Sequence, residues 1–149
     1  MVGSLDSYPL GFLEPVRGSS RAVVRKAQYT MRDSHKLLLA SGMIKGKLWN
    51  QRNHLLLLAK NRKKLGVYSL LRELAQEIDS ERVKLDTPKS REEILAFEAR
   101  AARFYWNGLS SVIPTSFGFE RRIGRGATDP FNVSLNFGYQ GYLFRACWK

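Results

Sequence analysis

The spacing of apolar residues over the stretch from Ser20 to about Lys60 constrains the fold most. The apolar residues there recur at intervals of three, four or seven and form one stripe: Leu37, Ile44, Leu48, Leu55 and Leu58. This spacing places them on one face of an α-helix, with an interruption predicted at Ser41-Gly42. The sequence contains no alternation of polar and apolar residues long enough to predict a sheet.

Helix start and stop signals define the later elements. A second helix is predicted from about Val67 to Val83. Ser90 with Glu93 forms a capping box that predicts a third helix running to Ile113, where Pro114 ends it. A glycine-containing loop follows, and Asp129-Pro130 predicts the start of a fourth helix. We therefore expect an all-α protein of four to six helices.

The first 19 residues carry several glycines and prolines, too many for a helix. We expect residues 1–19 to be a linker or the end of a missing element, with a possible short strand near Leu10–Phe12. The sequence does not begin with a basic segment followed by an apolar one, so we do not expect secretion. We expect a cytoplasmic protein instead. No apolar run approaches the length of a membrane span, so a membrane partner is not expected either.

The charge of the chain is strongly positive and uneven. Its 149 residues include 25 Lys and Arg against 13 Asp and Glu, for a net charge of +12. Fourteen bases and one acid lie between Arg17 and Arg72, whereas acids outnumber bases between Glu73 and Glu98. A local positive potential attracts phosphate, which favours a nucleic-acid partner over a merely solvated surface. The candidate contacts are Lys45, Lys47, Arg52, Lys60, Arg62, Lys63, Lys64, Arg121, Arg122 and Arg125.

Glu98 interrupts the apolar face of its own helix. It lies four residues after Ile94, three after Leu95 and three before Ala101. A carboxylate in that position needs a cation, a proton or a salt bridge, because desolvating it alone is costly. The spacing leaves two readings open: metal or catalytic work, and a structural salt bridge to an arginine.

Other candidate groups carry weaker signals. His35 and His54 have no carboxylate or second histidine at ligand spacing, and we assign neither a role. The Gly124-Arg125-Gly126 segment with Arg121-Arg122 could hold phosphate through backbone N–H groups and guanidinium groups. Aromatic side chains could stack on bases, although Tyr105 at helical spacing is more typical of a core.

The segment from Glu98 to Trp106, Glu-Ala-Arg-Ala-Ala-Arg-Phe-Tyr-Trp, resembles the glutamate motif of a known family. This is the CRISPR-associated endonuclease and integrase that acquires new spacers, the first-numbered Cas family. Asp129-Pro130-Phe131-Asn132 and the following Asn136-Phe137-Gly138-Tyr139 resemble its next block. Residues 25–28 and 45–51 are similar to the opening helices of its C-terminal domain.

The resemblance implies a function and a site. The family has a small N-terminal β domain and a larger helical domain, whose glutamate, histidine and aspartate surround Mg²⁺ or Mn²⁺. It cleaves DNA and joins spacer ends to the CRISPR repeat, as a homodimer with a second adaptation protein. Glu98 carries over as the catalytic and metal-binding glutamate. The alternative is a non-catalytic helical module that binds DNA or RNA.

The resemblance also implies domain boundaries. The family's histidine and aspartate lie past the helix that begins at Asp129-Pro130, inside which this sequence stops. We therefore expect residues 20–149 to be a helical DNA-binding and catalytic domain truncated at its C-terminus. Residues 1–19 would be a linker or the remnant of the β domain.

Overall fold

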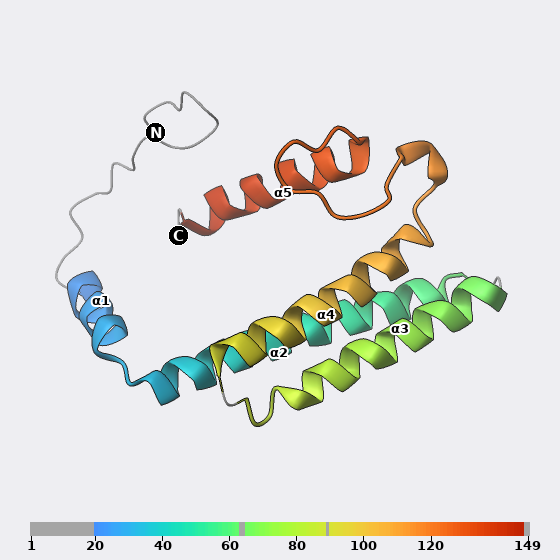
Figure 1. The fold of residues 1–149 in the computed structure, drawn as a ribbon. Coiled ribbons are helices and arrows are strands. Elements are labelled where there is room, and N and C mark those ends of the chain that lie inside the picture. The colour runs from blue at the N-terminus through green and yellow to red at the C-terminus, as the bar shows by residue number, and fades with distance from the viewer. Residues whose placement is uncertain (1–19, 63–64, 89, 148–149) are drawn as a thin grey trace. The chain divides into compact units, whose positions relative to one another are not determined.

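The structure is a computed structural model that describes residues 20–62, 65–88 and 90–147 (Figure 1). Five α-helices and one short 3₁₀ helix form its regular secondary structure, and these three ranges contain no β-strand. The expected all-α class, with four to six helices, is confirmed for this part of the chain. The strand predicted near residues 10–12 and the linker predicted for residues 1–19 lie outside the described residues.

The chain divides into two compact units, residues 1–36 and 37–149. In the first unit, α1 (Ser20–Thr30) ends before α2 (Asp33–Lys60) begins. The backbone carbonyl of Arg32 accepts hydrogen bonds from the backbone N–H groups of His35 and Lys36 and so starts the new helix. The Asp33 carboxylate lies in the first turn, where negative charge stabilises a helix.

The prediction of an interruption at Ser41-Gly42 is wrong, because α2 runs through both residues. Serine disfavours a helix interior when its hydroxyl competes for the backbone of its own helix. Here Ser41 is buried, and its Oγ donates instead to the backbone carbonyl of Leu85, 44 positions later. A tertiary hydrogen bond therefore replaces the local one, and the helix continues.

Three helices, α2, α3 (Leu65–Lys84) and α4 (Arg91–Ser110), pack together as a bundle. Its second helix, α3, runs antiparallel to α2. Lys45 pairs with Asp86, and Arg52, seven residues further along α2, pairs with Asp79, seven residues back. The bounds of α3 agree with the predicted helix to within two residues at the N-terminal end and one at the other. The two ion pairs fix the register of the first two helices.

The third helix of the bundle, α4 (Arg91–Ser110), begins as the capping box predicts. Ser90 Oγ accepts a hydrogen bond of 3.2 Å from the backbone N–H of Glu93. The helix ends at Ser110, three residues earlier than predicted, and a tight turn leads to Pro114. Side-chain contacts from α2 to α4 join residues 51 positions apart in two places, so α4 runs parallel to α2.

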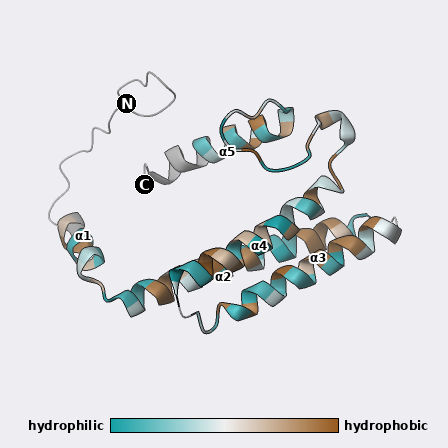
Figure 2. Ribbon diagram, in the orientation of Figure 1, coloured by the Kyte–Doolittle hydropathy of each residue, from teal (hydrophilic) through white to brown (hydrophobic). Residues whose placement is uncertain are grey.

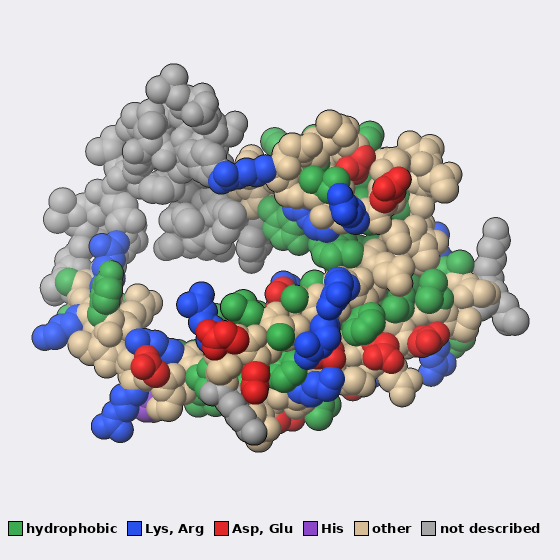
Figure 3. Space-filling model, in the orientation of Figure 1, with side chains coloured by type: hydrophobic (Ala, Val, Ile, Leu, Met, Phe, Trp, Pro, Cys, Tyr) green, Lys and Arg blue, Asp and Glu red, His purple; other side chains and the backbone are tan. Residues whose placement is uncertain are grey.

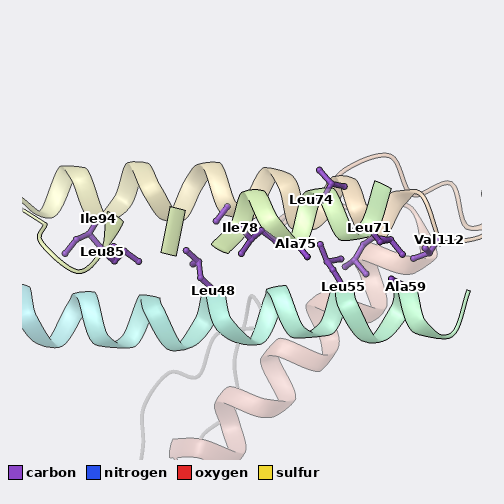
Figure 4. Close-up of a cluster of buried hydrophobic side chains, with 12 residues drawn as sticks. Leu48, Leu55, Ala59, Leu71, Leu74, Ala75, Ile78, Leu85, Ile94 and Val112 are labelled. Carbon is purple, nitrogen blue, oxygen red and sulfur yellow. The ribbon is translucent and has the colours of Figure 1, made fainter. Parts of the chain in front are cut away.

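The apolar stripe of α2 forms one wall of the core (Figure 4). Leu48 and Leu55 are fully buried against Leu71 and Ile78 of α3 and Ala101 of α4. The other members of the predicted stripe, Leu37, Ile44 and Leu58, are partly buried against the same cluster. Figure 2 shows apolar and polar residues alternating along these three helices. Burying each such leucine contributes about 1.5–3 kcal/mol.

The buried face of α4 differs in one place from the predicted face. Leu95 is 51% exposed, because the buried stripe follows Ile94, Ala101 and Leu109. Phe97 packs partly against the core instead. A one-residue step on a helix turns the side chain by about 100°, which carries Leu95 out of the stripe.

A loop containing a 3₁₀ helix (Thr115–Phe117) connects α4 to α5 (Pro130–Cys147). Gly118 has φ of 60°, a left-handed conformation that favours glycine. Phe119 is buried, with its ring 4.6 Å from that of Phe131 and 6.2 Å from that of Trp106. The aromatic contacts thus attach the start of α5 to the C-terminal part of α4.

Candidate functional site

Glu98 lies at the contact between α4 and α2, not in the centre of the core. Its side chain is 24% exposed and forms an ion pair with Lys47, which is 47% exposed. The cost of desolvating this carboxylate is therefore offset by a lysine of the neighbouring helix. The structural reading of Glu98 predicts a salt bridge to an arginine, but the partner is a lysine. The partial exposure of Glu98 leaves both readings of it open.

Two turns further along the same pair of helices, His54 meets Tyr105. His54 Nδ1 lies 2.9 Å from Tyr105 Oη, and the ring centroids are 5.9 Å apart. Burial raises the pKa of Tyr105, and the nearby Tyr139 raises it further, so the phenol keeps its proton. The parallel helices thus place Lys47 beside Glu98 and His54 beside Tyr105 in one row. We call these four residues the α2–α4 seam.

Gln51 lies between Lys47 and His54 on α2. Its Oε1 atom is buried and has no hydrogen-bond partner in the described part of the chain. The amide thus has an unused acceptor at this level of the bundle.

Two of the predicted nucleic-acid contacts are neutralised by α3 and the turn after it. Lys45 Nζ lies 2.5 Å from Asp86 Oδ1, and hydrogen bonding and attraction from Lys45 lower the pKa of Asp86. Arg52 Nε lies 3.5 Å from Asp79 Oδ1. The acidic stretch after residue 72, a separate segment in the sequence, thus supplies partners for the basic one. Figure 3 shows acidic side chains interspersed with basic ones over the helices.

Two further predicted contacts, Lys60 and Arg62, lie at the last residue of α2 and just after it. Lys60 and Arg62 are exposed, and neither forms an ion pair with the described residues. Lys63 and Lys64 lie outside the described residues. Lys60 and Arg62 therefore remain candidate phosphate contacts.

In the predicted phosphate-binding loop, Arg121 and Arg125 are exposed, but Arg122 is bound within the protein. The Arg122 guanidinium donates to the carbonyl of Ile123, to Asn132 Oδ1 at 3.1 Å and to Asn136 Oδ1 at 2.6 Å. Its N–H groups are thus used to hold the loop against α5, which departs from the predicted role of a free guanidinium clasp.

Asn132 organises this loop, a role that the sequence did not reveal. It is fully buried; its Oδ1 accepts from Arg122 and from the Ile123 backbone, and its Nδ2 donates to the Arg121 carbonyl. The backbone and side-chain N–H groups of Asn132 also donate to Asp129, which lowers the pKa of that carboxyl. The sequence signal that could have identified Asn132 is its position as the last residue of the Asp-Pro-x-Asn pattern.

A second unpredicted group connects α3 to α4. Glu81 is 5% exposed, and its carboxylate binds Arg100 and Lys84. Burial raises the pKa of Glu81, but the hydrogen bonds from Arg100 and Lys84 outweigh it and leave the pKa below 4.5. Arg100 lies two residues after Glu98, so its ion pair with the buried Glu81 fixes α4 close to the candidate carboxylate.

The described residues do not complete a metal site. They contain no cluster of three or more His, Cys, Asp or Glu side chains able to hold an ion. Around Glu98 they supply one carboxylate, and its ion-pair partner is a lysine. Divalent magnesium takes oxygen ligands and is held poorly by one carboxylate. Among the described helices, none is long and apolar enough to cross a membrane.

Known proteins resemble this chain along most of its length. The family model for CRISPR associated protein Cas1 matches residues 2–149. The chain is 34% identical over 142 residues to the CRISPR-associated endonuclease Cas1 1 of Saccharolobus solfataricus, covering 94% of this chain and 38% of that protein. The protein of the same name in Archaeoglobus fulgidus is 35% identical over 150 residues, covering 91% and 43%.

A relative in Korarchaeum cryptofilum, also called CRISPR-associated endonuclease Cas1, is 29% identical over 161 residues and covers all of this chain. The match spans 47% of that relative, so this chain corresponds to less than half the length of each of the three proteins. The matches include the glutamate motif on α4 and the Asp-Pro-x-Asn start of α5, because they cover almost the whole sequence. The chain belongs to the Cas1 family of CRISPR-associated proteins.

Proposed function

We propose that this chain carries the helical, glutamate-bearing part of a DNA endonuclease and integrase that acquires CRISPR spacers. The observation that carries the proposal is the position of Glu98: a partly exposed carboxylate on a helix fixed by the core and by the Glu81–Arg100 pair. A carboxylate held in this way can act on a substrate without reorganising. The names of the relatives support the reaction class, since each is called an endonuclease.

The substrate in this proposal is DNA: the ends of the spacer and the CRISPR repeat. The net charge of +12 favours such a polyanion, and Lys60 and Arg62 are exposed bases available for phosphate contacts. The full-length family pattern adds a homodimer and a second adaptation protein as partners. The reaction would take place in the cytoplasm, where the CRISPR array lies.

Glu98 is proposed as one oxygen ligand for Mg²⁺ or Mn²⁺, with other ligands supplied from outside the described residues. When bound, such an ion stabilises charge on a phosphate and activates a water or a 3′-hydroxyl. The contribution of this chain is to hold the Glu98 carboxylate at a fixed point on α4. In this structure Lys47 balances the charge of that carboxylate.

A second candidate function is supported by the same ion pair. If the Lys47–Glu98 contact is structural, the chain is a non-catalytic helical module that binds DNA or RNA. The two functions differ in what Glu98 does once nucleic acid is bound.

The test compares Mn²⁺-dependent cleavage of branched DNA by the protein that carries this chain and by its Glu98→Gln variant. We expect Glu98→Gln to remove cleavage and to leave DNA affinity within a factor of about two. Glu92→Gln, in the exposed first turn of α4, is the matched control and should leave both unchanged. Equal cleavage with and without the Glu98 carboxylate would remove Glu98 from the mechanism, and absence of cleavage by both proteins would favour the non-catalytic alternative.

A further inference from the structure

The two polar contacts of the α2–α4 seam lie a fixed distance apart. Lys47 and His54 are seven residues apart on α2, as are Glu98 and Tyr105 on α4. At a rise of 1.5 Å per residue, seven residues correspond to about 10 Å along the helices. Along one strand of duplex DNA, this length corresponds to about three nucleotides at an axial rise of about 3.4 Å each. A strand that follows the seam can therefore meet both contacts.

The His54–Tyr105 contact offers hydrogen-bond donors to an anion. His54 is exposed, and its Nδ1 is hydrogen-bonded to Tyr105 Oη. Its other ring nitrogen, Nε2, can therefore bond a different partner. No carboxylate of the described residues forms an ion pair with His54. The raised pKa of Tyr105 keeps its hydroxyl protonated. The pair can therefore donate to a phosphate oxygen in either tautomer: through His54 Nε2–H when Tyr105 donates to Nδ1, or through Tyr105 Oη–H when Nδ1–H donates to Tyr105.

A fixed positive charge lies beyond this pair. The Arg122 guanidinium carbon is 5.9 Å from the centre of the Trp106 ring, which packs edge-on at 5.1 Å against the Tyr105 ring. The hydrogen-bond acceptors of Arg122 are carbonyl and amide oxygens, and none of the described carboxylates pairs with it. Its full positive charge thus remains to attract an anion.

The other end of the seam does not repel phosphate. The negative charge of Glu98 is balanced by Lys47 in direct contact. Between the two contacts, α4 carries the small, partly exposed side chain of Ala102. The seam thus runs from a neutral ion pair to a hydrogen-bond donor, with the Arg122 guanidinium beyond the neighbouring Trp106 ring.

We propose that His54 and Tyr105, with the charge of Arg122 beyond the neighbouring Trp106 ring, form a phosphate-binding subsite that holds a single strand of DNA about 10 Å from Glu98. The subsite deepens the proposed function and rests on it, because the ligand is the DNA on which Glu98 would act. His54 and Tyr105 are binding residues in this account. They fix the position of the strand relative to the carboxylate.

The two histidines of the chain allow a direct test by NMR. In protein labelled with ¹³C-histidine, the side-chain Cε1–Hε1 signals of His35 and His54 are assigned with His35→Gln and His54→Gln variants. An oligothymidine of about 12 nucleotides, long enough to span the seam at 3.4 Å per nucleotide, is then added. We expect the His54 signal to shift with saturation and the His35 signal to stay in place. A His54 signal that does not move while the oligonucleotide binds overturns the subsite.

Affinity measurements give the second readout. Tyr105→Phe keeps the ring and removes the hydroxyl, and we expect it and His54→Ala to weaken oligothymidine binding about three- to tenfold each. The matched control, His35→Ala, removes the other exposed histidine and should stay within a factor of about two. Unchanged affinity in both seam variants overturns the inference while DNA binding itself stands. Failure of the unaltered chain to bind any DNA overturns the proposed function and the subsite together.

Discussion

Single residues with buried polar groups control the stability of this chain more than its many surface charges do. Glu81 and Asn132 are almost or fully buried, and each has several partners. Removing one partner of a buried polar group leaves the other desolvated and unpaired, which costs more than the net value of the bond. Exposed pairs such as Lys36–Asp33 contribute little by comparison.

The Glu81–Arg100 pair provides the first prediction. Arg100→Ala should lower the free energy of unfolding by about 1.5–3 kcal/mol, because Glu81 keeps only Lys84 as a partner. Lys84→Ala should cost less, because Lys84 makes one contact with Glu81 whereas Arg100 reaches it through both Nε and Nη2. Urea unfolding at pH 7 measures both, and equal losses would contradict the assigned difference.

The pH dependence of stability gives the second prediction. The pKa values of Glu81, Asp86 and Asp129 are all lowered in the folded state. As the pH falls, the unfolded chain therefore binds more protons than the folded chain does. The contribution of these carboxylates to stability should be complete at neutral pH and decrease below about pH 4.5. Denaturation midpoints between pH 7 and pH 3 check this, and Glu81→Gln should reduce the slope in the acid range.

Asn132 provides the third prediction, one with a local readout. Asn132→Ala leaves the backbone N–H of Ile123 and the side chains of Arg122 and Asp129 without their shared partner. We expect the free energy of unfolding to fall by about 1–3 kcal/mol and hydrogen exchange at the Ile123 amide to become faster. Asn107→Ala, on the exposed side of α4, is the control. Normal exchange protection at Ile123 in Asn132→Ala would contradict the role of Asn132.

At the scale of helices, the bundle is set by how closely α4 approaches α2. Gly108 is buried, and a Cβ atom added there would lie 2.9 Å from Leu55 Cδ2 and 3.1 Å from Leu55 Cδ1. Leu55 is itself fully buried and cannot move away freely. The close approach of these helices therefore depends on the missing side chain of one glycine.

The two glycines Gly108 and Gly46 give a matched pair for the fourth prediction. Gly46→Ala on α2 meets nothing within 4 Å and should stabilise the helix by about 0.5–1 kcal/mol. Gly108→Ala should instead destabilise, by about 1–3 kcal/mol relative to Gly46→Ala, because the added methyl overpacks the core. Thermal unfolding of the two variants compares them directly. A similar rise in melting temperature for both would show that α4 can shift away from α2.

At the scale of the whole molecule, the net charge is large but much of it is balanced locally. Four basic side chains of α2 and α3 form ion pairs with Asp79, Glu81 or Asp86. A paired lysine gains less by binding a phosphate, since it gives up a partner to do so. Affinity for DNA should therefore depend on which bases are unpaired rather than on the total charge.

The fifth prediction uses this difference. A plot of the logarithm of the binding constant for duplex DNA against the logarithm of the salt concentration has a negative slope. The double variant Lys60→Gln/Arg62→Gln should make this slope shallower by about 0.9 for each phosphate that is no longer neutralised. Lys45→Gln, whose lysine is held by Asp86, should change the salt dependence by less than half of that amount. Fluorescence anisotropy from about 50 to 200 mM salt gives the slopes. A flat salt response of the unaltered chain would refute the proposed basic contacts.

The sequence by itself determined the helical class, the core stripe and the helix starts at Ser90 and Asp129. These depend on local periodicity and on capping atoms within three residues, which a sequence displays directly. It also singled out Glu98, because a carboxylate in an apolar stripe is visible without a structure. It placed the first helical break wrongly, because the hydroxyl of Ser41 is satisfied by Leu85, far along the chain.

The tertiary structure alone decided what those side chains meet. Lys47 beside Glu98, and His54 beside Tyr105, follow from α2 and α4 running parallel in one register, with residues 51 positions apart side by side. The pairing of Lys45 and Arg52 with acids of a later segment has the same origin. Periodicity specifies which face of a helix is apolar, but contacts between distant residues depend on packing and register. The sequence therefore indicated the charged groups, and the fold decided which of them remain available to bind DNA.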